Sequence, residues 1–382
     1  MSEEFLPFAK PSISEEAIAE VVACLRSGWI TTGPRLQKFE EMLTEYHSGR
    51  RAICLSSATA GLQLALLALE LEDGDEVITT PLTFAATLNT IVLAGAKPVL
   101  VDIDSKTLNI NTAKIEEKIT PKTRAIMPVH FAGLPVDLDE IYALAKKHNL
   151  LMVEDCAHAI GAEYKGRKLC SFGDVQVMSF HPNKNMTTGE GGAVIANDAE
   201  LISKIEKLRF HGIDRNAFNR FSKAGSQDYD VVLAGYKYNM MDLQAALGIH
   251  QLPSLDSFIE KRTKLAENYL KEFADFAPLI LPEAPSYSHR HAWHLFTVRI
   301  SEKAKISRDE FIVRIKEKNI GVGLHYKSAH VFSFYAQNYG FAPHDFPESL
   351  KAGETICSLP LFPDMKEEEQ ARVVQAVREI LS

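Results

Sequence analysis

Apolar positions in the first half of the chain form two kinds of segment that alternate. Short apolar runs are typical of buried strands, and longer runs with a helical period are typical of helices packed on a sheet. Strands are predicted at RAICLS, DEVIT, KPVLVDI, RAIMPVH, LLMVE, VQVMSF and GAVIAN. Helices are predicted at SEEAIAEVVACLRS, GLQLALLALEL, AATLNTIVLAG, NTAKIEEKI, LDEIYALAKKHN and ELISKIEKLRF. The alternation predicts an α/β fold, with a mostly parallel sheet between two layers of helices.

The pattern changes in the second half. Residues 212–238 are polar and aromatic-rich without a clear period, which is typical of a functional or disordered segment. A long helix beginning near Met241, with a bend at Pro253, then leads into a smaller unit. That unit is predicted to contain strands at HAWHLFTVRI and GVGLHYK and helices at SRDEFIVRIKEKN and KEEEQARVVQAVREILS. We predict a large domain at residues 1–248 and a smaller α+β domain at residues 249–382.

Composition narrows the class of protein. The 382 residues, 46% of them hydrophobic, are enough for two cores. The net charge of −8 and the lack of a broad basic surface argue against a nucleic-acid partner. Five cysteines without a CxxC pair predict a reduced cytoplasmic protein with neither disulfides nor a metal cluster. MSEEFLPFAKPS does not have the pattern of a signal peptide, and no run of ~18 uncharged apolar residues predicts a membrane span.

Lys184 is the leading candidate for chemistry. It lies between the strand DVQVMSF and the glycine-rich turn before GAVIAN, within SFHPNKNMTTGEGG. A lysine enclosed by small and hydroxylated residues can lose its proton and form a Schiff base with a carbonyl. The alternative is a solvated turn lysine. The glycines of this turn do not complete G-x-G-x-x-G, which disfavours a dinucleotide site.

Three further segments supply groups that suit pyridoxal phosphate. The small residues SSAT, with Ala58 and Thr59, precede a helix and can bind a phosphate, although an ordinary helix cap has the same pattern. Asp155 ends a predicted strand, where its carboxylate can keep a pyridine nitrogen protonated, or it can cap a helix. His158 can bond to Asp155 or to the ring hydroxyl, or it is a core histidine. Phe84 can stack on a flat ring or pack in the core.

These segments occur in the order expected of a fold-type I pyridoxal phosphate enzyme. The chain resembles the DegT/DnrJ/EryC1/StrS sugar aminotransferases over nearly its full length. The stretches that carry the resemblance are GWITTGPRLQKFEE, SSATAGL, GDEVITTPLTFAATLN, VEDCAHAIGA, SFHPNKNMTTGEGG, GYKYNMMDLQAALG and GLHYKSAH. The resemblance implies a three-layer large domain with a seven-stranded, mostly parallel sheet, and a smaller carboxyl-terminal α+β domain.

The resemblance also implies roles for individual residues. Lys184 is expected to carry pyridoxal 5'-phosphate as a Schiff base and to shuttle a proton. The expected cofactor contacts are Ala58, Thr59, Phe84, Asp155, His158 and Ser179, with Asn239 reaching the phosphate of the neighbouring subunit. The expected substrate contacts are Trp29, His325, Tyr326, Lys327 and His330. Segment 212–238 is expected to cross to a partner, so that a homodimer shares its active sites.

The function implied is transfer of an amino group from L-glutamate, which leaves as 2-oxoglutarate, to a nucleotide-linked 4-keto sugar. Ser328 and Ala329 make the chain similar to the branch that forms UDP-4-amino-4-deoxy-L-arabinose for lipid A. Alternatives are transaminases that make a UDP-4-amino-4,6-dideoxyhexose or 8-amino-3,8-dideoxy-octulosonate, a dehydratase of the same fold, and a non-catalytic regulatory protein. Dehydratases of the fold have histidine in place of the lysine. Among cations, His181, Lys184, Arg209, Lys327 and His330 are candidates to bind the anionic substrate.

Overall fold

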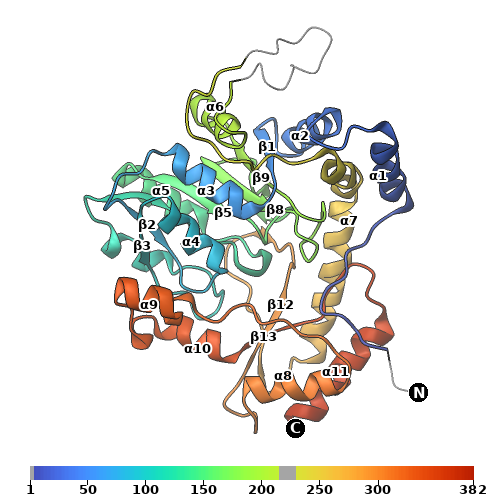
Figure 1. Cartoon of the computed structure of the whole chain (residues 1–382). Coiled ribbons are helices and arrows are strands. Elements are labelled where there is room, and N and C mark those ends of the chain that lie inside the picture. Colours follow the sequence, from blue (N-terminus) through green and yellow to red (C-terminus); the bar gives the residue numbers. More distant parts are fainter. Residues whose placement is uncertain (1–3, 215–228) are drawn as a thin grey trace.

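The computed structural model describes residues 4–214 and 229–382. A seven-stranded sheet lies between helices, and a smaller unit packs against one edge of this assembly (Figure 1). The strand order is β1-β9-β8-β5-β4-β2-β3, and every neighbouring pair is parallel except those that β9 forms with β1 and β8. The strands are β1 Arg51–Leu55, β2 Glu76–Thr79, β3 Lys97–Leu100, β4 Thr123–Ile126, β5 Leu151–Asp155, β8 Val175–Ser179 and β9 Gly192–Ala196. The predicted sheet is thus confirmed, with one antiparallel strand.

Alternating side chains of the strands enter two separate cores. In β1, Ala52 and Cys54 join one buried cluster, whereas Ile53 and Leu55 join another. Because successive side chains of a strand point to opposite faces, each face needs its own cover of helices. One face is covered by α3 Ala58–Ala68, α4 Ala85–Leu93 and α6 Ala199–Leu208, and the other by α2 Pro34–Tyr46, α5 Leu138–His148 and α7 Asp242–Glu272. The large unit is therefore a three-layer α/β structure.

Helix ends follow the local sequence. In α1, Glu15–Ser27, the Ser14 hydroxyl accepts a hydrogen bond from the Ala17 amide, and Gly28 ends the helix at a positive φ of 73°. A serine at the first cap and a glycine just beyond the last turn are favoured because they satisfy end groups and tolerate left-handed backbone. Helix α1 packs against α7 at the outside of the molecule.

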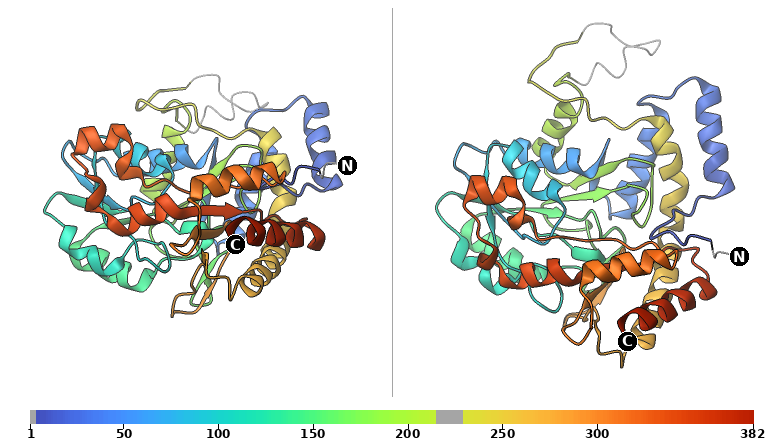
Figure 2. Two further views of the ribbon diagram at one scale, coloured as in Figure 1. Left: turned by 90° about the horizontal axis from the view of Figure 1, so that it is seen from below. Right: turned by 60° about the horizontal axis from the view of Figure 1, so that its bottom comes forward.

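The smaller unit contains a three-stranded antiparallel sheet in the order β10-β12-β13. Its core gathers Phe296 and Val298 of β12, Phe311 of α8 and Val373 of α11. Both ends of the described chain, Glu4 and Ser382, lie on this side of the molecule (Figure 2). The elements are β10 Leu279–Ile280, β12 Phe296–Ile300, α8 Arg308–Glu317, α9 Ser333–Tyr339, α10 Pro347–Thr355, β13 Ile356–Leu359 and α11 Glu367–Leu381. A third small sheet pairs β6 Glu163–Tyr164 with β7 Arg167–Lys168 and β11 His289–Arg290.

Helix α7 connects the two units without interruption, and Pro253 lies inside it. Ala245, Ile249, Leu252, Leu255 and Ile259 of this helix belong to the core of the large unit, and Leu265, Ala266 and Tyr269 belong to the core of the small one. Leu6 from the amino-terminal segment also packs in the small core. The division at residues 248 and 249 stays a prediction, and the change of core occurs farther along the helix.

Two predicted elements differ from the structure. NTAKIEEKI forms two 3₁₀ turns, Thr112–Lys114 and Glu116–Lys118, instead of the predicted helix. GVGLHYK is not a strand, since only Gly323 forms a bridge, to Ser358, before the chain enters the pocket described below. Helices α2, α9 and α10 were not predicted. Within the described residues, no helix is long and apolar enough to cross a bilayer, and the five cysteines are buried free thiols.

Candidate active site

The carboxyl ends of β5 and β8 and the start of α3 surround one pocket of about 300 Å³. Strand ends of a parallel sheet collect on one edge, so residues distant in sequence meet there. Ten predicted site residues line this pocket: Ala58, Thr59, Phe84, Asp155, His158, Ser179, His181, Lys184, His325 and Tyr326. The predicted grouping of these residues in space is therefore present in the fold.

Lys184 extends from the β8–β9 turn into the pocket. Its Nζ lies 3.3 Å from Nε2 of His294, and it forms no ion pair with any described residue. Removal from water lowers the pKa of Lys184 to about 8, and the nearby Asp155 carboxylate opposes this change. A substantial fraction of the amine is therefore neutral near physiological pH, as a nucleophilic lysine requires.

Asp155, at the end of β5, presents its carboxylate to the same pocket. Oδ2 accepts a hydrogen bond of 2.8 Å from the Thr87 hydroxyl, and Oδ1 accepts one of 3.1 Å from the Ala157 amide. Burial raises the pKa of Asp155, whereas these hydrogen bonds and the charge of Lys184 act to lower it. Two fixed donors and a cation thus favour the charged form of a carboxylate that is removed from water.

His158 is held in one tautomer. Its Nδ1 accepts a hydrogen bond from the Ala132 amide at 3.3 Å, and its Nε2 lies 2.9 Å from the Tyr326 hydroxyl. Burial lowers the pKa of His158 well below its ordinary value, so the ring is neutral and its proton is on Nε2. His158 therefore donates to Tyr326 rather than bonding to Asp155, and the Tyr326 hydroxyl keeps its own proton for a group in the pocket.

The start of α3 forms the end of the pocket that suits an anion. Ser57 caps the helix through a bond of 3.1 Å from the Ala60 amide, and Ala58 and Thr59 occupy the first turn. The first amides of a helix have no intrahelical acceptor and favour a negative ligand. A Cβ on Gly192 would lie 2.5 Å from the Ala58 nitrogen, so only glycine lets β9 approach this turn so closely.

Phe84 is 59% exposed although it is a large aromatic residue. It precedes α4 and lines the pocket, with its ring centroid 5.8 Å from that of Tyr326. The core-packing alternative is therefore excluded for Phe84. An exposed aromatic face at the pocket wall is suited to stack on a flat ring.

Other predicted site residues lie outside this pocket. Trp29 is 42% exposed and donates from its indole to the Thr32 carbonyl, and Lys327 is exposed. His330 is fully buried, and its nitrogens contact the Ser328 hydroxyl and the Pro343 carbonyl.

Two more predicted contacts also lie away from the pocket of their own chain. The Asn239 side chain donates to the Thr32 hydroxyl at 2.6 Å. Arg209, a candidate for anion binding, is instead buried in an ion pair with Glu40 and donates to the Cys54 carbonyl. The expected anion-binding role of Arg209 does not fit its geometry, because the side chain is buried and its charge is paired with Glu40. Of segment 212–238, residues 215–228 lie outside the described residues.

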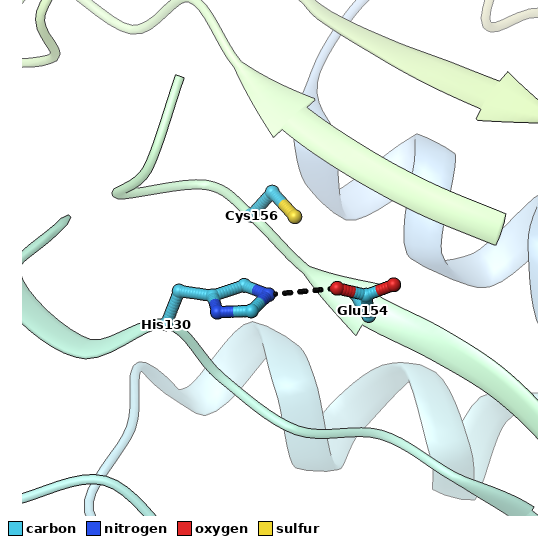
Figure 3. A group of neighbouring side chains, drawn as sticks. All are labelled: His130, Glu154 and Cys156. Carbon is cyan, nitrogen blue, oxygen red and sulfur yellow. Dashed lines mark hydrogen bonds and ion pairs between the residues drawn. The ribbon is translucent and has the colours of Figure 1, made fainter. Parts of the chain in front are cut away.

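A buried cluster of His130, Glu154 and Cys156 lies just behind Asp155, on and beside β5 (Figure 3). His130 Nδ1 accepts a hydrogen bond from the Val136 amide, so Nε2 carries the ring proton and donates to Glu154 at 3.0 Å. This nitrogen therefore has no lone pair for a metal ion. The hydrogen bond anchors the end of β5, where Asp155 begins the pocket.

Sequence reasoning missed His294, which touches the Lys184 amine. It lies 110 positions away from Lys184, in the HAWHLF segment before β12. A histidine in an apolar segment was the available signal, but nothing local in the sequence indicates which side chain it meets.

The pocket residues fit pyridoxal phosphate group by group. An amine of lowered pKa is placed for the aldehyde, a buried carboxylate for the pyridine nitrogen, an exposed phenyl ring for the ring face and a helix start for the phosphate. Together with the three-layer fold, these groups define the class of fold-type I pyridoxal phosphate enzymes.

Comparisons with known proteins specify this class further. The model of the DegT/DnrJ/EryC1/StrS aminotransferase family matches residues 11–378. The chain is 43% identical to the spore coat polysaccharide biosynthesis protein SpsC of Bacillus subtilis, over 99% of this chain and 97% of that protein. The chain therefore belongs to the DegT/DnrJ/EryC1/StrS aminotransferase family.

Two solved structures have the same fold. The putative sugar aminotransferase Spr1654 of Streptococcus pneumoniae, in its PMP form, superposes with a TM-score of 0.92 at 33% identity, covering 98% of both chains. Helicobacter pylori PseC, an aminotransferase involved in the biosynthesis of pseudoaminic acid, gives 0.91 at 30% identity over 99% of both chains. The protein is a pyridoxal-phosphate-dependent sugar aminotransferase.

Proposed function

We propose that this enzyme moves the amino group of L-glutamate to a nucleotide-linked 4-keto sugar. The observation that carries the proposal is the meeting of Lys184, Asp155, Phe84 and the start of α3 around one pocket. Family membership supplies the sugar class. Glutamate as donor, the nucleotide and the carbon that is aminated are parts of the proposal.

Each residue has a distinct part in this chemistry. Bound pyridoxal phosphate supplies the electron sink that stabilises a carbanion. Lys184 would hold the cofactor covalently, and its amine, once freed, would accept the proton from the donor α-carbon and donate it again. Asp155 keeps the pyridine nitrogen protonated. Phe84 covers one face of the ring.

The remaining pocket residues orient the reactants. The amides of Ala58 and Thr59, with the hydroxyl groups of Thr59 and Ser179, bind the phosphate at the start of α3. His325 and Tyr326 line the pocket on the side of the smaller unit and are placed for the sugar. The Tyr326 hydroxyl donates a hydrogen bond there, because His158 already donates to its oxygen.

Cofactor loading is expected to follow the neutral fraction of Lys184. Since only the unprotonated amine attacks an aldehyde, the rate at which cofactor-free protein binds pyridoxal phosphate covalently should rise with pH and level off above about pH 8. Visible absorbance at saturating cofactor, followed between about pH 6 and pH 10.5, measures this rate. A rate that continues to rise towards pH 10.5, the range of an ordinary lysine, would contradict the lowered pKa.

There are two candidates for the sugar that accepts the amino group. Resemblance to the arabinose branch proposes a UDP-linked 4-keto-pentose, but Ser328 and Ala329, which carry that resemblance, are buried and do not line the pocket. Ser328 contacts Ser349, and the Ala329 amide donates to the Pro81 carbonyl. The second candidate is a UDP-linked 4-keto-6-deoxyhexose, the acceptor of a transaminase that makes a UDP-4-amino-4,6-dideoxyhexose.

A panel of keto-sugar nucleotides tests the proposal. Purified enzyme would receive glutamate and either the UDP-4-keto-pentose or the UDP-4-keto-6-deoxyhexose, and the aminated sugar would be measured by mass spectrometry. Alanine or glutamine replacing glutamate serves as the donor control. Formation of 2-oxoglutarate without amination of any nucleotide-linked 4-keto sugar would remove the proposed acceptor while leaving the donor in place.

We also propose that a homodimer shares its active sites, with Asn239 serving the pocket of the partner. The location of Asn239 outside its own pocket supports this proposal. Mixing an inactive Lys184→Ala protein with an impaired Asn239→Ala protein, under conditions that exchange subunits, should restore activity. One site of a mixed dimer then carries both lesions and the other carries neither, so recovery reaches up to about half per mixed dimer.

A matched mixture controls for this complementation. Lys184→Ala mixed with Asp155→Asn should show no recovery, because both residues line the pocket of their own chain and every site keeps one defect. Verified subunit exchange without recovery in the Asn239→Ala mixture would exclude a shared site, while leaving the lysine chemistry unaffected.

A further inference from the structure

The imidazole of His294 contacts the amine of Lys184. The distance from His294 Nε2 to Lys184 Nζ is 3.3 Å, and His294 is only 2% exposed. The other ring nitrogen, Nδ1, has no hydrogen-bond partner in the described part of the chain. Contact with the reacting nitrogen is therefore the one polar interaction of this ring among residues 4–214 and 229–382.

The backbone that carries His294 is fixed from the side of α7. The buried guanidinium group of Arg262 donates through Nη1 to the carbonyls of Trp293 and His294, both at 3.3 Å, and to that of Leu361 at 2.9 Å. Arg262 thus links the segment that contains His294 to the residues that follow β13. Such anchoring limits the movement of the imidazole relative to the pocket.

The same segment is also fixed to the turn that carries Lys184. Asn185, the next residue after the lysine, donates its side-chain amide to the Ala292 carbonyl at 2.5 Å. The Ala292 amide donates to the Gly133 carbonyl at 2.9 Å. The positions of Lys184 and His294 relative to each other are therefore fixed by hydrogen bonds that involve neither of their side chains.

The surroundings of His294 keep its ring neutral. Burial lowers the pKa of His294 well below its ordinary value, and the charges of Lys184 and Arg262 act in the same direction. When Lys184 is an ammonium ion it has no lone pair, so Nε2 of the neutral imidazole accepts from it and the ring proton is on Nδ1. A hydrogen bond to an ammonium ion is stronger than one to a neutral amine, because it is charge-assisted.

We propose that His294 is a further catalytic residue, which accepts a hydrogen bond from Lys184 while the lysine carries its proton. During transfer the freed lysine takes a proton from the donor carbon and later delivers it to the cofactor carbon, so it alternates between amine and ammonium. His294 Nε2 stabilises the ammonium between these events and holds Nζ at one point of the pocket wall. The proton that leaves the donor carbon is the one delivered to the cofactor carbon, and none is transferred to His294.

Several other groups face this pair and are unchanged in the test. Asp155 at the end of β5 raises the pKa of Lys184, whereas His158, His325 and Arg262 lie near His294 on other elements. The last of these groups is the Tyr326 hydroxyl, which is hydrogen-bonded to His158. Because these groups are common to all variants, a change in lysine titration reports the loss of the His294 acceptor.

The first measurement is the titration of Lys184 in the full-length chain freed of cofactor. Reductive methylation of Lys184 at a series of pH values, quantified by peptide mass spectrometry, gives the pH at which half of the amine is reactive. His294→Leu should lower that pH by about one unit, since a hydrogen bond to a charged group is lost. His294→Gln supplies an acceptor oxygen and should recover most of the shift.

The second measurement is the glutamate half-reaction, which rests on the proposed donor, whereas the titration does not. In His294→Leu, kcat for 2-oxoglutarate formation should fall about tenfold while KM for glutamate is unchanged, because the ammonium forms only after binding. His291→Leu is the matched control. That histidine lies in the same segment but stacks on Trp293 with a centroid distance of 3.9 Å, and it should leave both measurements unchanged.

A spectroscopic measurement covers the case in which His294→Leu does not fold. In unsubstituted protein labelled with ¹⁵N-histidine, His294 Nε2 should appear as an unprotonated nitrogen, and its resonance should move in Lys184→Ala. A protonated Nε2 would overturn the proposal. A folded His294→Leu protein with unchanged lysine titration would also overturn it, as would a His294→Gln protein as impaired as His294→Leu.

Discussion

Lys184→Ala is expected to abolish turnover while leaving the fold intact. The substitution removes the covalent attachment of the cofactor and the group that moves the proton, and general acid–base catalysis alone contributes about 10²–10⁴ to the rate. We therefore expect a fall of at least about four orders of magnitude in aminated product. Circular dichroism of the variant should match that of the unsubstituted protein, because alanine in this turn leaves the packing of β8 and β9 in place.

A chemical measurement identifies the lysine directly. Borohydride reduction of the holoenzyme should fix the cofactor to the peptide that contains Lys184, and mass spectrometry locates it. Lys237 is the informative comparison, since burial also lowers its pKa, yet it lies against Asn239 and the Phe210 ring rather than in the pocket. Cofactor found on Lys237 would reject the assignment of Lys184.

The sequence was sufficient for those parts of the site that depend on local order. Lys184 follows a buried strand, Asp155 ends one, and Thr59 begins a helix, so the carboxyl edge of a parallel sheet brings the three together. The alternation of strand and helix patterns predicted that sheet. Neither inference needs to know which side chains meet across the fold.

Residues whose role depends on a distant partner were not predictable in this way. Arg209 and His330 are recognisable as cations or hydrogen-bond donors in the sequence, but the sequence does not show Glu40 or the Pro343 carbonyl that each one meets. His294 is the converse case. Its contact with Lys184 depends on how Arg262 positions a segment that no local pattern connects to the pocket.

Asp155→Asn is the second substitution for which a large effect is expected. Asparagine keeps the shape of the side chain, and its oxygen still accepts the hydrogen bond from the Ala157 amide. Its amide group can donate to the Thr87 hydroxyl, which in turn can donate to Thr83, so the local packing is preserved. What is lost is the negative charge that keeps the pyridine nitrogen protonated.

We expect the rate of 2-oxoglutarate formation from glutamate to fall by about two to three orders of magnitude in Asp155→Asn, which corresponds to roughly 3–4 kcal/mol of barrier. Thr87→Val is the matched control: it removes one hydrogen bond to the carboxylate but keeps the charge, so its loss should be about tenfold. Single-turnover measurements with glutamate separate this step from sugar binding. Because the effect is on charge, a near-normal rate in Asp155→Asn, or an equal loss in Thr87→Val, would show that Asp155 acts through packing and would reject its proposed role.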